Sequence, residues 1–229
     1  MVTETHFQKE LEELKENLLK MAAMVEEAIR DSVESLVKRD SDLAQKTFEF
    51  EDRINKIEIV IDDMCLKLLA LRQPMAVDLR FITSAMKIIT DLERMGDQAV
   101  NIAERAISLN QELQLKPYID IPRMAEIAQS MVKDVLNAFV NRDSKLARSV
   151  CQRDDLVDGL NDQVVRELLT YMMSDPKTIP RAVHLIIVAR CLERIADHAT
   201  NIAEDVIFMV DALVIKHHAD EKAEEEKER

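Results

Sequence analysis

The chain has 229 residues, of which 47% are hydrophobic and 33% charged, with two glycines, five prolines and no tryptophan. Few turn-forming residues and an aromatic content of 3% disfavour a sheet protein and favour long helices, so we expect an all-α fold. The formal net charge of −13 argues against a nucleic-acid partner, because the phosphate backbone attracts cationic surfaces.

Helical periodicity in the first half of the chain predicts three long helices, over about 5–37, from about 41 to Leu71, and on to about Leu113. Asp40 or Ser41 can cap the second helix. Pro74 disfavours helix at the residue before it and separates the second helix from the third. The stretch QLKPYIDIPR that follows contains two prolines and is the one loop long enough to link two domains.

The second half predicts three further helices, over about 122–140, up to the stretch MMSDPKTIP, and on to about Ile215. The acidic tail 217–229 has no apolar face, and we expect it to be disordered. The three cysteines stand alone in apolar helical patterns and are expected to be small buried residues of a reduced, cytoplasmic protein. The acidic, amphipathic N-terminus does not resemble a signal peptide, and no apolar run is long enough to span a membrane.

The two halves repeat one another. LERMGDQAVNIAE at 92–104 returns as LERIADHATNIAE at 192–204, and VKRDSDLA at 37–44 returns as VNRDSKLA at 140–147. Ten of the sixteen positions in 92–107 and 192–207 are identical, which indicates an internal duplication. We therefore predict two tandem homologous three-helix bundles with six long helices, over 1–115 and 116–216, each closing its own core.

The repeated stretch places polar side chains on one face of a helix. With about 100° of rotation per residue, the first acid, the Asp four residues later, the Asn and the final Glu form a narrow stripe, away from the apolar stripe that faces the core. The preceding helix of each half carries a second polar stripe, formed by Glu51 and Asn55 with Glu58 and Asp62 beyond them, and by Asp154 and Asp158 in the second half. Because a short turn makes the two helices antiparallel, residues equidistant from it lie at the same height. Four oxygen-bearing side chains should therefore meet in each bundle: Glu51, Asn55, Glu93 and Asp97 in the first, and Asp154, Asp158, Glu193 and Asp197 in the second.

Clustered carboxylates repel one another, and a bound cation removes that cost. Oxygen ligands without Cys or His favour hard ions such as Mg²⁺, Mn²⁺, Ca²⁺ or iron. Asn55 leaves the first set one charge short, so the two sites are expected to differ in affinity. The alternative is that these acids are only solvated surface residues. His198 is replaced by Gln98 in the first repeat, which disfavours a shared role for this position.

The motifs RDSDLA, RQPMAVDLR, LERMGDQAVNIAE, RDSKLA, YMMSDPKTIP and LERIADHATNIAE, in this order, resemble the PhoU family of bacterial phosphate-uptake regulators. The resemblance covers nearly the whole chain. It implies two homologous three-helix bundles with metal clusters bound by paired E(D)xxxD signatures, which fall on the eight residues reached from the turn geometry. The chain departs from the family pattern at Asn55, where an acid is usual, and at Ala196, where the first repeat has Gly96.

The resemblance also implies a role. The protein would be an adaptor and not an enzyme, coupling the ATPase of a phosphate ABC transporter to a sensor histidine kinase, and acting as a negative regulator of the phosphate regulon. Iron, manganese, magnesium or zinc are the expected metals. We further expect a cytoplasmic homodimer that reaches the membrane only through its partners. Two alternatives stay open: a metal-dependent enzyme that uses the carboxylate clusters, and a helical scaffold whose acids only confer solubility.

Overall fold

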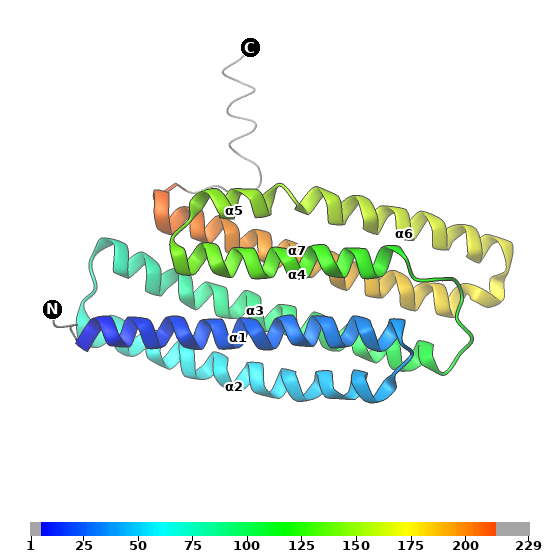
Figure 1. Cartoon of the computed structure of the whole chain (residues 1–229), viewed down its shortest axis with the longest axis horizontal. Helices are drawn as coiled ribbons and strands as arrows, with labels where there is room; N and C mark the ends of the chain where they lie inside the picture. The colour runs from blue at the N-terminus through cyan, green and yellow to red at the C-terminus, as the bar shows by residue number, and fades with distance from the viewer. Residues whose placement is uncertain (1–5, 214–229) are drawn as a thin grey trace, which may run out of the picture.

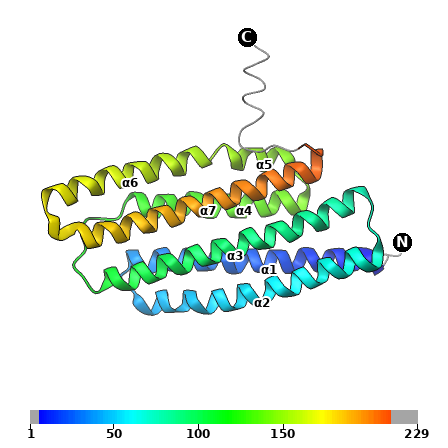
Figure 2. The same cartoon turned by 180° about the vertical axis from the view of Figure 1, so that it is seen from behind.

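The fold is all-α, as predicted, in a computed structural model that describes residues 6–213 (Figures 1 and 2). No strand occurs in this range. The helices are α1 (His6–Val37), α2 (Ser41–Arg72), α3 (Ala76–Asn110), α4 (Asp120–Asn141), α5 (Ser144–Cys151), α6 (Asp154–Ser174) and α7 (Ile179–Asp211), with a 3₁₀ turn η1 (Pro176–Thr178) before α7. The acidic tail 217–229 lies outside the described residues.

Matching caps begin the second helix of each half. Asp40 accepts hydrogen bonds from the backbone N–H groups of Asp42 and Leu43, both at 3.0 Å. Asp143 caps α5 in the same way. A carboxylate at this position satisfies donors that the helix itself leaves without partners. The prediction that Asp40 caps the second helix is confirmed.

The predicted fifth helix is interrupted, so α5 and α6 together take its place. The break falls at residues 152 and 153, where the Arg153 guanidinium donates to Asp134 at 2.7 Å and to Ser130 at 3.1 Å, both on α4. Asp154 then stands in the first turn of α6, where a negative charge interacts favourably with the helix dipole. Periodicity continues across the break and therefore could not indicate it.

The predicted ends of the third and sixth helices were too late. α3 ends at Asn110, where the Arg39 guanidinium from the α1–α2 loop donates to the carbonyls of Leu109, Asn110 and Glu112. α7 ends at Asp211, because Ala212 adopts a left-handed conformation with φ of 56°. Such a residue commonly ends a helix by turning the chain away from its axis.

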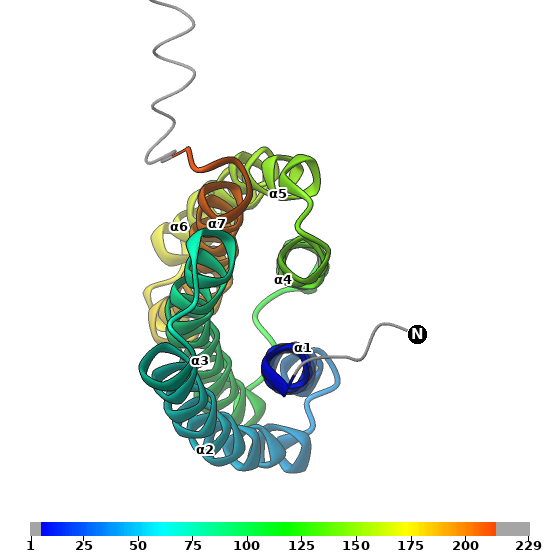
Figure 3. The ribbon, with the colours of Figure 1, turned by 90° about the vertical axis from the view of Figure 1, so that its left-hand side faces the viewer.

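The two bundles share one continuous core instead of closing two separate ones. α1, α2 and α3 pack together, as do α4 with α5, α6 and α7, and the bundles meet where α3 packs on α7 and α1 on α4. Viewed from the end, α1 and α4 lie on one side, and α2, α3, α7 and α6 follow an arc on the other (Figure 3). None of the helices in the described range is long and apolar enough to cross a membrane.

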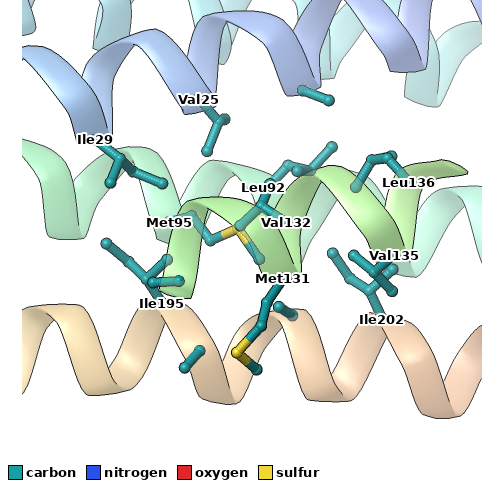
Figure 4. Close-up of a cluster of buried hydrophobic side chains, with 14 of the residues drawn as sticks. Val25, Ile29, Leu92, Met95, Met131, Val132, Val135, Leu136, Ile195 and Ile202 are labelled. Carbon is teal, nitrogen blue, oxygen red and sulfur yellow. The ribbon is translucent and has the colours of Figure 1, made fainter. Parts of the chain in front are cut away.

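Side chains from four helices meet at this junction. Figure 4 shows Ile29 of α1, Leu92 of α3, Val132 of α4 and Ile195 of α7 directed into one cluster. Elsewhere the ring of Phe81 on α3 stacks on that of Phe139 on α4, with centroids 4.8 Å apart. Burial of this surface is the main favourable contribution to folding, so the stability of one bundle depends on the presence of the other.

Candidate functional site

The helices that carry the predicted ligands form an antiparallel hairpin in each bundle. α2 and α3 are joined through residues 73–75, and α6 and α7 are joined through Asp175 and η1. Figure 1 shows both hairpins, with α2 beside α3 and α6 beside α7. Residues at the same distance from each turn therefore lie at the same height, as the sequence predicted.

Acidic side chains of the first set come together on the α2–α3 face. Burial, followed by the charge of Asp97, raises the pKa of Glu51 above its usual range. The pKa of Glu93 is raised by burial and then by Asp97 and Glu58, with a smaller contribution from Glu51. Asp97 on α3 thus lies within electrostatic reach of carboxylates on both helices, as the hairpin symmetry requires.

Three acids of the second set come together on the α6–α7 face. Burial and then Asp197 raise the pKa of Asp158. The pKa of Glu193 is raised by burial and then by Asp197 and Asp158. Burial also raises the pKa of Asp197, although His198 and Arg194 act against it. Asp154 stands at the start of α6, where its charge, together with that of Glu204, reaches the thiol of Cys151.

Glu58 is a member of the first face that the predicted set omitted. Burial and then the charges of Asp62 and Asp97 raise its pKa, and it acts in turn on Glu93. Its position seven residues after Glu51 places it on the same side of α2. The sequence placed Glu58 on the polar stripe of this helix, but the four-residue ligand set did not include it.

Glu58 also changes the comparison of the two faces. Shifted by 103 residues, α2 aligns with α5 and α6, and Ile54 and Ile61 fall on Val157 and Val164, all four buried. The three polar positions Glu51, Asn55 and Glu58 then correspond to Asp154, Asp158 and Asn161. At these three positions, each half has two acids and one asparagine. The asparagine is at the second position in the first half and at the third position in the second half. The predicted set of four remains one charge short in the first bundle, but the two helices carry equal charge once Glu58 and Asn161 are counted.

Both of these asparagines have a buried amide oxygen without a partner. Neither Oδ1 of Asn55 nor Oδ1 of Asn161 accepts a hydrogen bond within residues 6–213. A buried acceptor of this kind typically costs about 1–3 kcal/mol unless a donor or a cation satisfies it. In each half, the unsatisfied oxygen belongs to the helix that also carries the clustered carboxylates.

The donor chemistry of the two faces fits a hard cation, since every candidate ligand atom is an oxygen. The arrangement is nevertheless open: across the part of the chain described, no three Asp, Glu, His or Cys side chains are gathered closely enough to hold a metal ion. Glu51, Asn55, Glu93 and Asp97 are only half-buried. Metal binding would therefore require these side chains to turn toward one another.

Comparison with known protein families matches the PhoU domain twice, at residues 18–106 and 121–206. A PhoU homolog of the phosphate-specific transport system from Aquifex aeolicus is 49% identical over 94% of this chain and 98% of its own. The chain belongs to the PhoU family. Among solved structures, PhoU from Pseudomonas aeruginosa has a TM-score of 0.88 at 44% identity and covers 91% of this chain and 100% of its own. PhoU from Streptococcus pneumoniae has a TM-score of 0.86 at 30% identity, over 93% of this chain and 100% of its own.

Each PhoU domain match contains one of the two predicted ligand sets. The first match lies within α1, α2 and α3, and the second begins in α4 and ends in α7. Names of the curated relatives describe accessory proteins of the phosphate-specific transport system. The PhoU fold and its duplication are thus shown by both sequence and structure.

The two PhoU domains differ in packing directly beneath the acidic faces. A Cβ atom at Gly96 on α3 would lie 3.0 Å from Cδ1 of Ile54 on α2, closer than side chains normally approach. In the second domain the corresponding residues are Ala196 and Val157, so a larger residue on one helix accompanies a smaller one on the other. Helix spacing can then be similar in both domains, which keeps the two polar stripes at comparable separations.

Proposed function

We propose that this protein is a metal-binding regulatory adaptor of a phosphate-specific transport system. In this proposal it couples the transporter ATPase to the cytoplasmic domain of a sensor histidine kinase and represses the phosphate-starvation genes when phosphate is plentiful. Membership of the PhoU family supports the association with phosphate transport. The role requires surfaces that dock other proteins, and no catalytic step is assigned to this chain.

Metal binding is supported by one observation: the pKa values of several carboxyl groups are raised on each of the two faces. Burial and then neighbouring carboxylates raise the pKa of Glu93 on the first face and of Glu193 on the second. Holding like charges together on a half-buried surface destabilises the metal-free protein. A cation such as Mn²⁺, Fe²⁺, Mg²⁺ or Zn²⁺ removes that repulsion and also offers a partner to the amide oxygens of Asn55 and Asn161.

Titration calorimetry tests metal binding directly. The parent protein is titrated with each of the four metals, beside a variant with Glu93→Gln and Glu193→Gln. A matched control carries Glu16→Gln and Glu126→Gln, which remove two exposed acids from α1 and α4. We expect binding in the parent and the control and a loss in the first variant. Equal binding in all three proteins would refute the assignment of the faces.

A strain without this protein tests the regulatory role. We expect such a strain to express its phosphate-starvation genes in rich phosphate, and the parent and the Glu16→Gln, Glu126→Gln control to restore repression. Normal repression without the protein would refute the adaptor role. An enzymatic role would appear instead as sustained turnover of phosphate esters in the presence of metal, abolished by Asp197→Asn.

A further inference from the structure

A polar groove of about 390 Å³ lies on the line where the two bundles meet, beside the acidic faces, and it shares Asp197 with the second of them. It is formed by α3 and α7, which occupy the middle of the arc in Figure 3. Its lining consists of two arginines, two amides, one imidazole and one carboxylate: Arg94, Arg194, Gln98, Asn201, His198 and Asp197. Every one of these residues belongs to the duplicated motif.

The duplication explains why two arginines reach one groove. α3 and α7 run in opposite directions (Figure 1), and Nδ1 of His198 lies 2.9 Å from Oδ1 of Asp91. Because the helices are antiparallel, counting from this contact three residues forward along α3 and four residues back along α7 places Arg94 opposite Arg194. These are equivalent positions of the two repeats. A residue that lies opposite its own copy stands on the pseudo-twofold axis, so a charge present once in each repeat is present twice in the groove.

Neither arginine is held by a hydrogen bond or a close ion pair in the described part of the chain, although Arg194 acts electrostatically on Asp197. Arg94 and Arg194 are exposed, and neither forms an ion pair or a hydrogen bond with any residue in the range 6–213. Arg153, by contrast, is held by Asp134. Two positive charges and one negative charge, from Asp197, give the lining a net positive charge in a chain whose net charge is −13.

The lining has the chemistry of an oxyanion site. A guanidinium presents parallel N–H donors that match the oxygens of phosphate or carboxylate. The amides of Gln98 and Asn201 add neutral donors, and the contact with Asp91 fixes the ring of His198 at the edge of the groove. Bringing two guanidinium groups together costs Coulomb energy that a bound anion offsets.

We propose that this groove binds inorganic phosphate, held between Arg94 and Arg194. Binding of an oxyanion follows from the lining alone, whereas the choice of phosphate among oxyanions rests on the proposed function. The protein would then contact phosphate itself at the junction of its two domains, in addition to any contact with a transporter. Because α3 and α7 belong to different bundles, a ligand held by both arginines favours one relative position of the two domains.

The proposal is tested by titrating the metal-free protein with phosphate. Metal is first removed with a chelator, and the chelator is then removed by dialysis. The proteins compared are the parent, Arg94→Gln, Arg194→Gln and the double variant. Arg190→Gln is the matched control, because it removes an exposed arginine from α7 one turn before Arg194 and outside the groove. We expect saturable binding in the parent and the control, and a loss of about tenfold or more for each groove variant, typical of a charge-assisted hydrogen bond.

A second measurement locates the site independently of affinity. The arginine Nε–Hε NMR signals of the parent are followed during the titration. The signals of Arg94 and Arg194 are identified by their absence from the spectra of Arg94→Gln and Arg194→Gln. We expect these two signals to shift and that of Arg190 to stay constant. The absence of saturable binding up to about 10 mM phosphate, or an equal loss in Arg190→Gln and the groove variants, would overturn the proposal. Normal phosphate binding in a protein that fails to restore gene repression would refute the proposed function and leave the groove site standing.

Discussion

The contact between Gly96 and Ile54 predicts a specific non-additivity. In Gly96→Ala, the better helix propensity of alanine contributes about 0.8–1 kcal/mol. The new Cβ would lie 3.0 Å from Cδ1 of Ile54, and moving that side chain from its preferred rotamer costs about 0.5–1.5 kcal/mol. We therefore expect the stability of the single variant to remain within about 0.5 kcal/mol of the parent.

Ile54→Val alone removes the buried Cδ1 and should destabilise the protein by about 0.5–1.5 kcal/mol. In the double variant, the alanine Cβ occupies the space that Cδ1 left, and the next nearest atom, Cγ2, is at a comfortable 3.6 Å in the parent. The cost of the clash disappears, and part of the cavity is filled. We expect a favourable coupling of about 1 kcal/mol between the two substitutions.

Urea unfolding followed by circular dichroism measures the four corners of this double-mutant cycle. The second domain provides the control, because Ala196 and Val157 already form the alanine–valine combination. Ala196→Gly should destabilise the protein by about 1 kcal/mol, without a compensating release of strain. If the effects of Gly96→Ala and Ile54→Val add to within about 0.3 kcal/mol, the explanation of the two packing arrangements is wrong.

Three further predictions concern the acidic faces, the shared core and the caps. Glu93→Gln with Glu193→Gln should stabilise the metal-free protein at pH 7, because burial and then neighbouring carboxylates raise both pKa values. The folded state then binds protons more tightly than the unfolded state, so the gain in stability is complete above the folded-state pKa and vanishes below the ordinary glutamate pKa of 4.5. Urea titrations at pH 7 and pH 4 check this, and an equal gain at both would contradict it. Phe139→Ala should cost about 3–5 kcal/mol and leave one unfolding transition for both bundles, since its ring stacks on Phe81 across the junction; two separate transitions in calorimetry would argue against a shared core. Asp143→Ala should cost about 0.5–2 kcal/mol by removing the α5 cap, and Asp143→Asn should restore most of it in the same urea assay.

Local signals were sufficient to predict most of the helices. Asp40 has a side chain that competes for the first free N–H groups of a helix, and Pro74 cannot continue one, so these boundaries depend on chemistry within a few residues. The break before α6 could not be predicted in this way. It depends on the hydrogen bonds of Arg153 to Asp134, a residue on another helix, and the sequence gives no sign of that contact.

Periodicity also could not show that the two bundles share a core. It identifies the apolar side of each helix but not the helix that covers it. Leu92 and Ile195 read as core residues of separate bundles, whereas in the structure both belong to one core cluster with Val132 of α4 at the junction (Figure 4). Packing between domains is set by the sum of many weak contacts, which no short motif records.

The candidate site was predictable because hairpin symmetry is a local property. An antiparallel pair with a short turn fixes which residues are level, so the positions of Glu93 and Asp97 follow from the position of the turn. Only residues that form two pairs at equal distance from the turn were included, however, so the predicted set has four residues in each bundle and does not include Glu58. Side chains of this length reach beyond their own level, and electrostatic coupling extends further than a hydrogen bond.

The order of residues within the repeated motif places its acid and its arginine on different sides of the helix. Glu93 and Arg94 are adjacent, and about 100° of rotation separates them on the helix, so the acid is directed toward α2 and the arginine toward α7. Duplication then gives two acidic faces on either side of one basic groove. The groove is not symmetric, however, because Asp197 lines it and Asp97 does not. A cation bound by Asp197 on the second face would reduce the negative charge that opposes an anion in the groove. If both proposals hold, metal loading of the second face should strengthen phosphate binding, while loading of the first face should leave it nearly unchanged.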